Sequence, residues 1–211
     1  MRLIDIHTHN IEQDPKVITL AQFELSNRLP IGYYSFGIHP WNTSDKELVD
    51  LSIAKLIILL ESSNPPLAIG ECGLDKIRGA SLDRQLEVFE QQLYLAVKFS
   101  KPVIVHCVKA WDHFITLVKR SCFTGVKIII HGFRGSTELM KQLTRLPNIW
   151  LSFGEYYRED SVIAIPIDRM FIETDTSGIP IDAIYTQIAN IKNISKLELV
   201  DQINKNFIQL K

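Results

Sequence analysis

Side chains that commonly bind metal ions follow or end short apolar runs at five places in this chain. The first run carries His7 and His9, which are two residues apart and therefore point to the same side of a strand. The later runs lead to Glu71, His106, His131 and Asp175. Imidazoles and carboxylates in this combination suit a borderline divalent ion such as zinc, manganese or cobalt. One histidine after an apolar run is usually a core residue, but the repetition favours a shared metal site.

Strand-like runs alternate with helix-like segments, which predicts an α/β fold. The expected strands are Leu3–Ile6, Val17–Leu20, Tyr33–Phe36, Leu67–Gly70, Val103–Val105, Lys127–Ile130, Ile149–Ser152 and Met170–Ile172. The expected helices are Asp45–Leu60, Leu82–Phe99, Trp111–Arg120, Thr137–Leu146, Ile181–Ile191 and Lys196–Leu210. Strands that each lead to a ligand predict a (β/α)8 TIM-type barrel, because the C-terminal strand ends of such a barrel open onto one face.

The first third of the chain departs from this alternation. Only residues 10–16 separate the first two strands, which is too few for a crossover helix. Residues 21–32 include Pro30 and show no helical stripe. We therefore expect the helices after strands 1 and 2 to be missing or vestigial. No linker or repeat appears, so we expect a single domain over residues 1–211.

Composition narrows the class of protein further. The chain has 211 residues, 46% of them apolar, and a formal net charge of −1, so no global basic field attracts nucleic acid. Cys72, Cys107 and Cys122 show neither a metal-binding nor a disulfide spacing. The first residues show neither a basic region nor an apolar region of the kind found in signal peptides, so we expect none, and no apolar run is long enough to span a bilayer. We expect a cytoplasmic protein that does not associate with membranes and has no implied protein partner.

Several longer motifs, in this order, resemble those of the TatD-related metal-dependent deoxyribonucleases, which are amidohydrolase-like barrels. The matching segments are Ile4-Asp-Ile-His-Thr-His9, Gly37-Ile-His-Pro-Trp41, Ala68-Ile-Gly-Glu-Cys-Gly-Leu-Asp75, Arg84-Gln85, Pro102-Val-Ile-Val-His106, His131-Gly-Phe-Arg-Gly-Ser136 and Phe171-Ile-Glu-Thr-Asp175. They run through most of the chain. Together they are specific, although each motif alone is not.

The resemblance implies a site for two divalent ions, which could be zinc, manganese, cobalt or magnesium. His7, His9 and Asp175 would hold one ion, His106 and His131 the other, and Glu71 would bridge the two. Asp175 and Glu71 would be the catalytic residues. With a metal-activated hydroxide as the nucleophile, Asp175 would accept the proton of the attacking water.

The chain also departs from the family at the expected mouth of the barrel. Members typically carry an arginine two residues after the fifth-strand histidine, where it is a natural phosphate clamp. This chain has Val108 there, with Lys109 beside it. The segments 10–32 and 176–180 are also shorter than usual.

Other polar residues near the ligands have two readings each. Asp5 and Glu173 could accept hydrogen bonds that orient the ligands, or could be structural residues inside the barrel. His39 could contact substrate or cap the turn that follows it, and Asp75 could contact substrate or orient its loop. Arg134 could bind an anion or form a surface ion pair. We expect His39, Asp75, Lys109 and Arg134 to be substrate contacts.

The leading hypothesis is a metal-dependent hydrolase of phosphodiester bonds whose partner is DNA or a small phosphodiester. The same ligands could instead serve amide or ester hydrolysis, because a divalent cation also polarises a carbonyl group. A catalytically idle barrel that acts as a binding module is the alternative from another class. A binding module does not need six converging metal ligands, which argues against this alternative.

Overall fold

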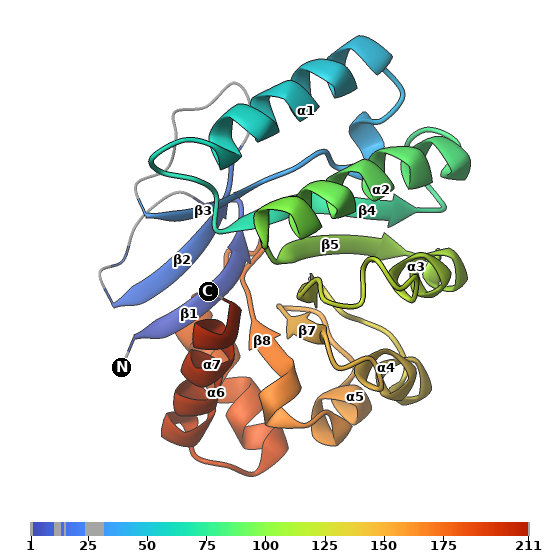
Figure 1. Cartoon of the computed structure of the whole chain (residues 1–211). Coiled ribbons are helices and arrows are strands. Elements are labelled where there is room, and N and C mark those ends of the chain that lie inside the picture. Colours follow the sequence, from blue (N-terminus) through green and yellow to red (C-terminus); the bar gives the residue numbers. More distant parts are fainter. Residues whose placement is uncertain (1, 11–13, 15, 24–31, 211) are drawn as a thin grey trace. The chain divides into compact units, whose positions relative to one another are not determined.

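Eight strands form one sheet in a computed structural model of the chain (Figure 1), in the order β1-β2-β3-β4-β5-β6-β7-β8. The strands are β1 (Leu3–Thr8), β2 (Val17–Gln22), β3 (Tyr33–Phe36), β4 (Ala68–Asp75), β5 (Val103–Val108), β6 (Ile128–Ile130), β7 (Ile149–Phe153) and β8 (Met170–Ile172). The pairs β1–β2, β3–β4, β4–β5 and β7–β8 are parallel. Parallel strands in sequence order are those of a TIM-type barrel, so the predicted fold class is confirmed. The structure describes residues 2–10, 14, 16–23 and 32–210.

Most of the predicted helices are confirmed as well. The helices are α1 (Lys46–Leu60), α2 (Leu82–Phe99), α3 (Trp111–Val118), α4 (Thr137–Thr144), α5 (Glu159–Ala164), α6 (Ile181–Lys192) and α7 (Lys196–Leu210), with short 3-10 helices η1 (Pro40–Asn42) and η2 (Ile167–Arg169). Ser81 caps α2 by accepting a hydrogen bond from the Arg84 N–H, as its sequence position predicts. The sequence did not predict α5, because six residues are too few to show a clear apolar stripe.

The expected lack of helices after the first two strands holds for the described residues between β1 and β3. Residues 14, 16–23 and 32 contribute β2 and turns, and none of them is helical. The remainder of this expectation falls on residues 11–13, 15 and 24–31, which lie outside the described part of the chain.

The chain divides into two compact units, and the single-domain expectation stays a prediction. Unit 1 consists of Met1–Ala21, Pro30–Tyr33 and Ile129–Lys211, and unit 2 of Gln22–Leu29 and Tyr34–Ile128. In unit 1, α6 and α7 pack against each other and against β1 and β8. The buried Tyr185 hydroxyl of α6 accepts a hydrogen bond from the Ile4 N–H (3.1 Å) and donates one to the Ile4 carbonyl (2.9 Å). This helix therefore fixes the strand that carries His7.

In unit 2, β4 and β5 lie side by side and α2 packs along β4 (Figure 1). Gln92 of α2 is fully buried, and its side chain accepts a hydrogen bond from the Ile38 N–H (2.7 Å) and donates to the Ile38 carbonyl (3.2 Å). Gly73 of β4 lies so close to β5 that an added Cβ would be 2.1 Å from the His106 carbonyl oxygen. Glycine at this position is therefore needed for the pairing of the two strands.

Five strands continue past their predicted ends: β1, β2, β4, β5 and β7. The differences are largest in β4, which continues to Asp75, and in β5, which continues to Val108, so that Glu71 and His106 lie within their strands. The pairing continues because Gly73 faces His106 and Asp75 faces Val108, after a register shift between Ile69 and Cys72. Such pairing depends on the neighbouring strand, and a run of local sequence does not reveal it.

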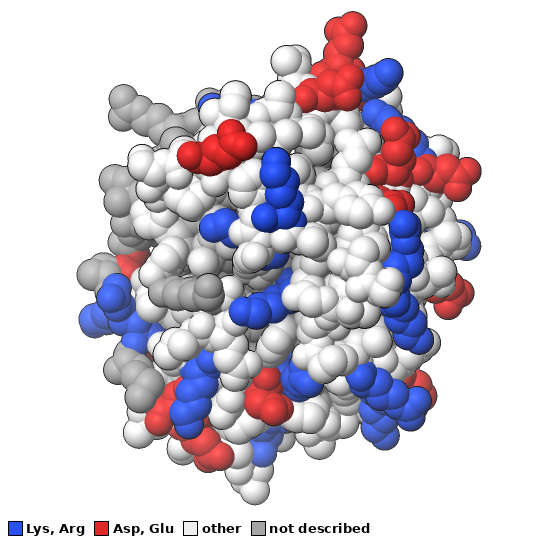
Figure 2. Space-filling model, viewed as in Figure 1, with Lys and Arg blue, Asp and Glu red and all other residues white. Residues whose placement is uncertain are grey.

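Charges of both signs are interspersed on the face shown in Figure 2, in keeping with a formal net charge of −1. Across the described residues, none of the helices combines the length and the apolar composition that crossing a membrane requires. The expected cytoplasmic location stays a prediction.

Candidate metal centre

Three of the expected ligands come together in unit 1 at the end of β1. The donor atoms of His7, His9 and Asp175 all lie within 4.8 Å of one another. Oδ1 of Asp175 is 3.7 Å from Nε2 of His7 and 3.7 Å from Nε2 of His9. These separations are too long for hydrogen bonds. They are close to the roughly 3.4 Å that separates two ligand atoms around a tetrahedral ion with bonds of about 2.1 Å.

The backbone fixes Asp175 against β1. Its N–H donates to the His7 carbonyl and its carbonyl accepts from the His9 N–H, each at 3.0 Å. Asp175 also has a positive φ of 53°. Aspartate tolerates this left-handed conformation better than most residues do. The paired strand end and the left-handed turn together aim the carboxylate at the two histidines.

Asp5 supports this arrangement through Thr174, not through a histidine ring. Its Oδ1 accepts from the Thr174 N–H (3.0 Å) and its Oδ2 from the Thr174 hydroxyl (2.6 Å). Burial raises the pKa of the Asp5 carboxyl to about 7, although the hydrogen bonds from Thr174 oppose this shift. Because Thr174 precedes Asp175, Asp5 holds the backbone from which that carboxylate projects.

His131 lies beside His7 in the same unit, with 4.5 Å between the ring centroids. Its Nδ1 is 3.5 Å from Oε1 of Glu173, and that oxygen also accepts from the Gly132 N–H at 2.6 Å. Burial alone would raise the pKa of Glu173, but hydrogen bonding and attraction to His131 outweigh it and hold the pKa below its ordinary value. The carboxylate on Nδ1 leaves the opposite ring nitrogen, Nε2, as the position for an ion.

In unit 2, Glu71 is the centre of a second group that also contains His39 and His106. Its Oε1 lies 2.9 Å from Nδ1 of His106 and 3.2 Å from Nε2 of His39. The Glu71 N–H donates to Oε1 of Gln22 (2.7 Å), which also accepts from the Ser35 hydroxyl (2.9 Å). The three residues offer donor atoms within 4.8 Å of one another, and Glu71 and His106 are the proposed ligands among them.

His39 caps the turn that follows it, which is one of the two roles considered for it, and its contact with substrate stays a prediction. Its Nδ1 accepts a hydrogen bond from the Trp41 N–H at 3.2 Å, which caps η1. The proton of a neutral His39 ring therefore lies on Nε2, which faces Glu71. In this tautomer His39 orients the Glu71 carboxylate and is not a ligand.

Asp75 orients the loop that follows it, which is one of the two roles considered for it. Its Oδ2 accepts from Nε1 of Trp41 at 2.7 Å and lies 3.4 Å from Nε2 of His106. Its Oδ1 accepts from the N–H groups of Ile77 and Arg78. Burial would raise the pKa of Asp75, but the hydrogen bonds from Trp41 and the loop lower it below its ordinary value. An ionised Asp75 can then hold the His106 ring from the side opposite Glu71.

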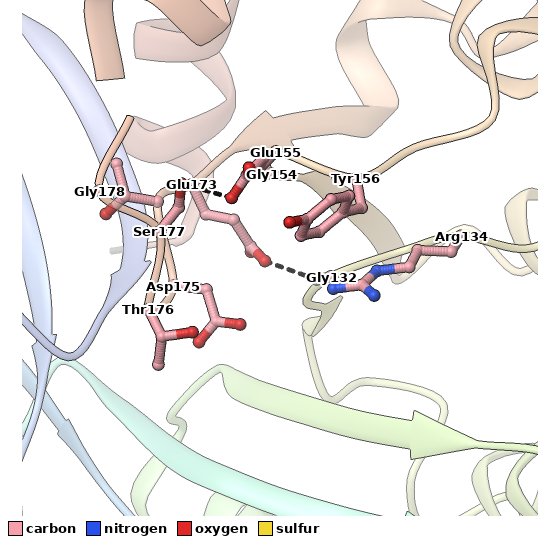
Figure 3. Close-up of a pocket in the computed structure, with 11 residues that line it drawn as sticks. Gly132, Arg134, Gly154, Glu155, Tyr156, Glu173, Asp175, Thr176, Ser177 and Gly178 are labelled. Atoms are coloured by element: carbon pink, nitrogen blue, oxygen red, sulfur yellow. Dashed lines mark hydrogen bonds between the residues drawn. The ribbon is translucent and has the colours of Figure 1, made fainter. Parts of the chain in front are cut away.

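A cavity of about 270 Å³ opens beside the unit 1 ligands (Figure 3). Asp175 and Glu173 lie on one side of it, and Arg134 and Tyr156 lie on the other. The Arg134 guanidinium is 4.9 Å from the centroid of the Tyr156 ring. A cation on an aromatic face next to the candidate ligands is suited to an anionic substrate. This supports the anion-binding reading of Arg134.

Lys109 is exposed at the end of β5, next to Val108, with a positive φ of 52°. Its role as a substrate contact stays a prediction. The carbonyl of Val108 accepts from the Lys76 N–H at 2.9 Å, which adds a second basic residue at this strand end.

Sequence reasoning missed four residues that hold the candidate ligands in place: Gln22, Trp41, Gln85 and Thr174. Gln22 ends an apolar strand and is buried, so the pattern of an apolar run followed by a polar residue could have identified it. Trp41 follows His39 in a matched motif, but its bond to Asp75 links residues 34 apart. No local pattern predicts a contact of that kind.

A family model described as TatD related DNase matches residues 6–210 of this chain. The chain belongs to the TatD-related DNase family. One relative is the uncharacterized metal-dependent hydrolase YabD of Bacillus subtilis, which is 34% identical over 170 residues, a match that covers 77% of this chain and 65% of the relative. Another is the 3'-5' ssDNA/RNA exonuclease TatD of Erwinia amylovora, which is 35% identical over 148 residues, a match that covers 66% of this chain and 56% of the relative. The matches thus span somewhat less than two thirds of these relatives.

Solved structures with the same fold include the TatD homologue YJJV of Escherichia coli K12, with a TM-score of 0.82, 21% identity and coverage of 99% of this chain and 97% of that one. A TatD-family hydrolase of Entamoeba histolytica gives a TM-score of 0.79 at 20% identity, with coverage of 100% and 98%. These likenesses show the fold of this TatD-family chain. The six-ligand arrangement and the bridging by Glu71 stay predictions.

Proposed function

We propose that this chain is a metal-dependent hydrolase that cleaves phosphodiester bonds of single-stranded nucleic acid. The observation that carries the proposal is the grouping of His7, His9 and Asp175, with donor atoms within 4.8 Å of one another. The nucleic-acid substrate is supported by relatives such as the Erwinia amylovora ssDNA/RNA exonuclease and a human 3'-5' RNA nuclease, which is 28% identical over 174 residues.

The residues proposed to hold divalent metal are those that the family resemblance implies. His7, His9 and Asp175 would hold one ion, and Glu71, His106 and His131 are the further proposed ligands. A bound divalent cation supplies Lewis acidity, which lowers the pKa of water to about 7 and stabilises negative charge on phosphoryl oxygens.

Asp175 is the proposed proton acceptor. Its side chain is 30% exposed, so that a water molecule can reach the carboxylate. One oxygen faces the two histidines, and the other can take a proton from water at hydrogen-bond distance. Asp5, acting through Thr174, keeps the carboxylate in place, and Arg134 would bind a phosphate of the substrate.

A substrate screen tests the proposal. The protein, loaded in turn with Mg²⁺, Mn²⁺, Co²⁺ or Zn²⁺, is incubated with end-labelled single-stranded DNA and RNA, an aryl phosphodiester, an ester and an amide. We expect cleavage of the oligonucleotides and of the diester, and loss of both activities with a chelator. Intact nucleic acid under every metal, together with cleavage of the amide or ester, would contradict the proposal and support carbonyl hydrolysis.

A further inference from the structure

An arginine is stacked on a half-exposed tryptophan next to the candidate ligands of unit 2. The guanidinium carbon of Arg78 lies 3.9 Å from the centroid of the Trp41 ring, and 41% of Trp41 is exposed. A guanidinium that lies on a ring keeps its N–H donors in its own plane, where they can bind a phosphate. Because Arg78 covers one face of the indole, a nucleobase would stack on the opposite face.

The tryptophan is fixed in position. Its Nε1 donates to the buried Asp75 carboxylate at 2.7 Å, and its ring meets that of His39 edge to face at 4.6 Å between centroids. Trp41 is therefore held by one hydrogen bond and by contacts with the rings of His39 and His106. An aromatic side chain fixed in this way loses little conformational freedom when a ligand binds.

The loop that carries Arg78 is also ordered before any ligand binds. Gln85 is 1% exposed, and its side chain accepts from the Asp75 N–H (2.7 Å), while its two amide N–H groups are shared among the carbonyls of Asp75, Arg78 and Ala80. Gly79 (φ 92°) lies against η1. A Cβ added to it would be 2.6 Å from the Pro40 carbonyl oxygen. The guanidinium is thus presented from a rigid loop.

Trp41 and Arg78 lie next to residues that are proposed to take part in hydrolysis. The Trp41 ring centroid lies 5.9 Å from that of His106, whose Nδ1 contacts Glu71. A nucleotide bound on Trp41 would therefore lie next to the candidate ligands. Lys76, exposed and two residues before Arg78, adds positive charge to the same loop.

We propose that Trp41 and Arg78 bind one nucleotide of a single-stranded nucleic acid, with the base stacked on Trp41 and a phosphate bound by Arg78. This inference rests on the proposed function and gives its substrate a binding position. In this role Trp41 selects single strands, because a paired and stacked base has no free face for the indole.

The test measures binding of metal-loaded protein to a short labelled oligothymidylate with phosphorothioate linkages, which resists cleavage, and to a matched strand without bases. We expect Trp41→Leu to weaken binding of the strand with bases by about 5- to 150-fold, the range found for one stacked base. The same variant should weaken binding of the strand without bases by less, because only the support that Trp41 gives to Arg78 is lost there. Arg78→Ala should weaken binding of both strands, because the phosphate is common to them.

Three comparisons separate the proposal from a structural role of the pair. Trp41→Phe keeps an aromatic face but loses the N–H to Asp75, so it should bind more tightly than Trp41→Leu. Equal losses in both variants would overturn base stacking. Tyr94→Leu removes a half-exposed tyrosine of α2 that contacts Arg120, and it should bind as the wild type does. If Trp41→Leu fails to fold, equal binding of the two strands by the wild type overturns the proposal.

The outcomes also separate this inference from the proposed function. If the wild type cleaves oligonucleotides but Trp41→Leu binds them as tightly as the wild type does, the proposed function would be supported and the stacking site would be excluded. Base-dependent binding at Trp41 without cleavage of any nucleic acid would confirm the stacking site and contradict the proposed function.

Discussion

The two roles proposed for Asp175 make different demands on one carboxylate. As a ligand it would have to face His7 and His9, and as a base it would have to reach water. Its backbone bonds to His7 and His9 and its 30% exposure meet both demands. The two tasks can be separated experimentally, because an amide keeps an oxygen for the metal but is a very poor base.

We expect Asp175→Asn to bind metal, although more weakly, and to lower kcat by about 100-fold or more, the usual contribution of base catalysis. The measurement is kcat on the oligonucleotide together with the metal content of the same sample. Asp168→Asn, an identical change at an exposed position of η2, is the control. Near wild-type turnover in Asp175→Asn with metal present would show that another group is the base.

At the scale of elements, one buried glutamine holds the loop between β4 and α2. The Gln85 side chain satisfies the Asp75 N–H and faces three carbonyl groups of residues 75–80. Its loss leaves several of these groups buried without a partner, and each such group costs about 1–3 kcal/mol.

We therefore expect Gln85→Ala to lower the free energy of unfolding by about 2–3 kcal/mol, measured by urea denaturation. Gln91→Ala, at an exposed position of the same helix, should change it by less than about 0.5 kcal/mol. Gln85→Glu keeps the acceptor but places a buried carboxylate oxygen against the three carbonyls, so it should be at least as unstable as Gln85→Ala. A loss in Gln85→Ala no larger than in Gln91→Ala would show that the loop does not depend on this side chain.

The sequence predicted elements better than it predicted their ends and contacts. β3, β8, α2 and α7 have the predicted bounds, because their apolar patterns and caps are local. The ends of β4 and β5 were missed because their pairing through Gly73 depends on the neighbouring strand.

The same distinction applies to the candidate site. The residue types and order of the ligands could be predicted from short motifs, and the structure brings His7, His9 and Asp175 together as expected. The link from Asp5 to Thr174 and the link from Trp41 to Asp75 connect distant residues. The geometry of these links depends on the fold, and no single segment of the sequence predicts it.

At the scale of the whole molecule, we expect two divalent ions per chain at saturating metal. The six ligands that the family resemblance implies are enough for two ions, and they motivate this number. Glu71→Ala should lower the occupancy of both ions if this carboxylate bridges them, because a carboxylate has two oxygens available as ligands. Metal analysis by mass spectrometry tests both statements, and a stoichiometry of one in the wild type would contradict the two-ion expectation.

The near-neutral charge of the molecule predicts a weak dependence of binding on salt. With a formal net charge of −1, binding should rely on a few local contacts with phosphates. Each contact with a single strand contributes about −0.7 to the slope of log K against log salt concentration. We expect a slope of about −1 to −2, and a slope that is less negative by about 0.7 in Lys109→Asn, which removes the charge and tolerates the positive φ. An unchanged slope in this variant would exclude Lys109 as a phosphate contact.

The candidate ligands of unit 1 also determine when the proposed metal site can form during synthesis. His7 and His9 leave the ribosome before Asp175. Asp5 must wait for Thr174, 169 residues later, and Asp175 follows it. At ~5–20 residues per second, this interval lasts roughly 10–30 s. A nascent chain that stops within this interval carries both histidines but lacks Asp175, the proposed base. A truncated translation product therefore cannot act as a hydrolase by this mechanism.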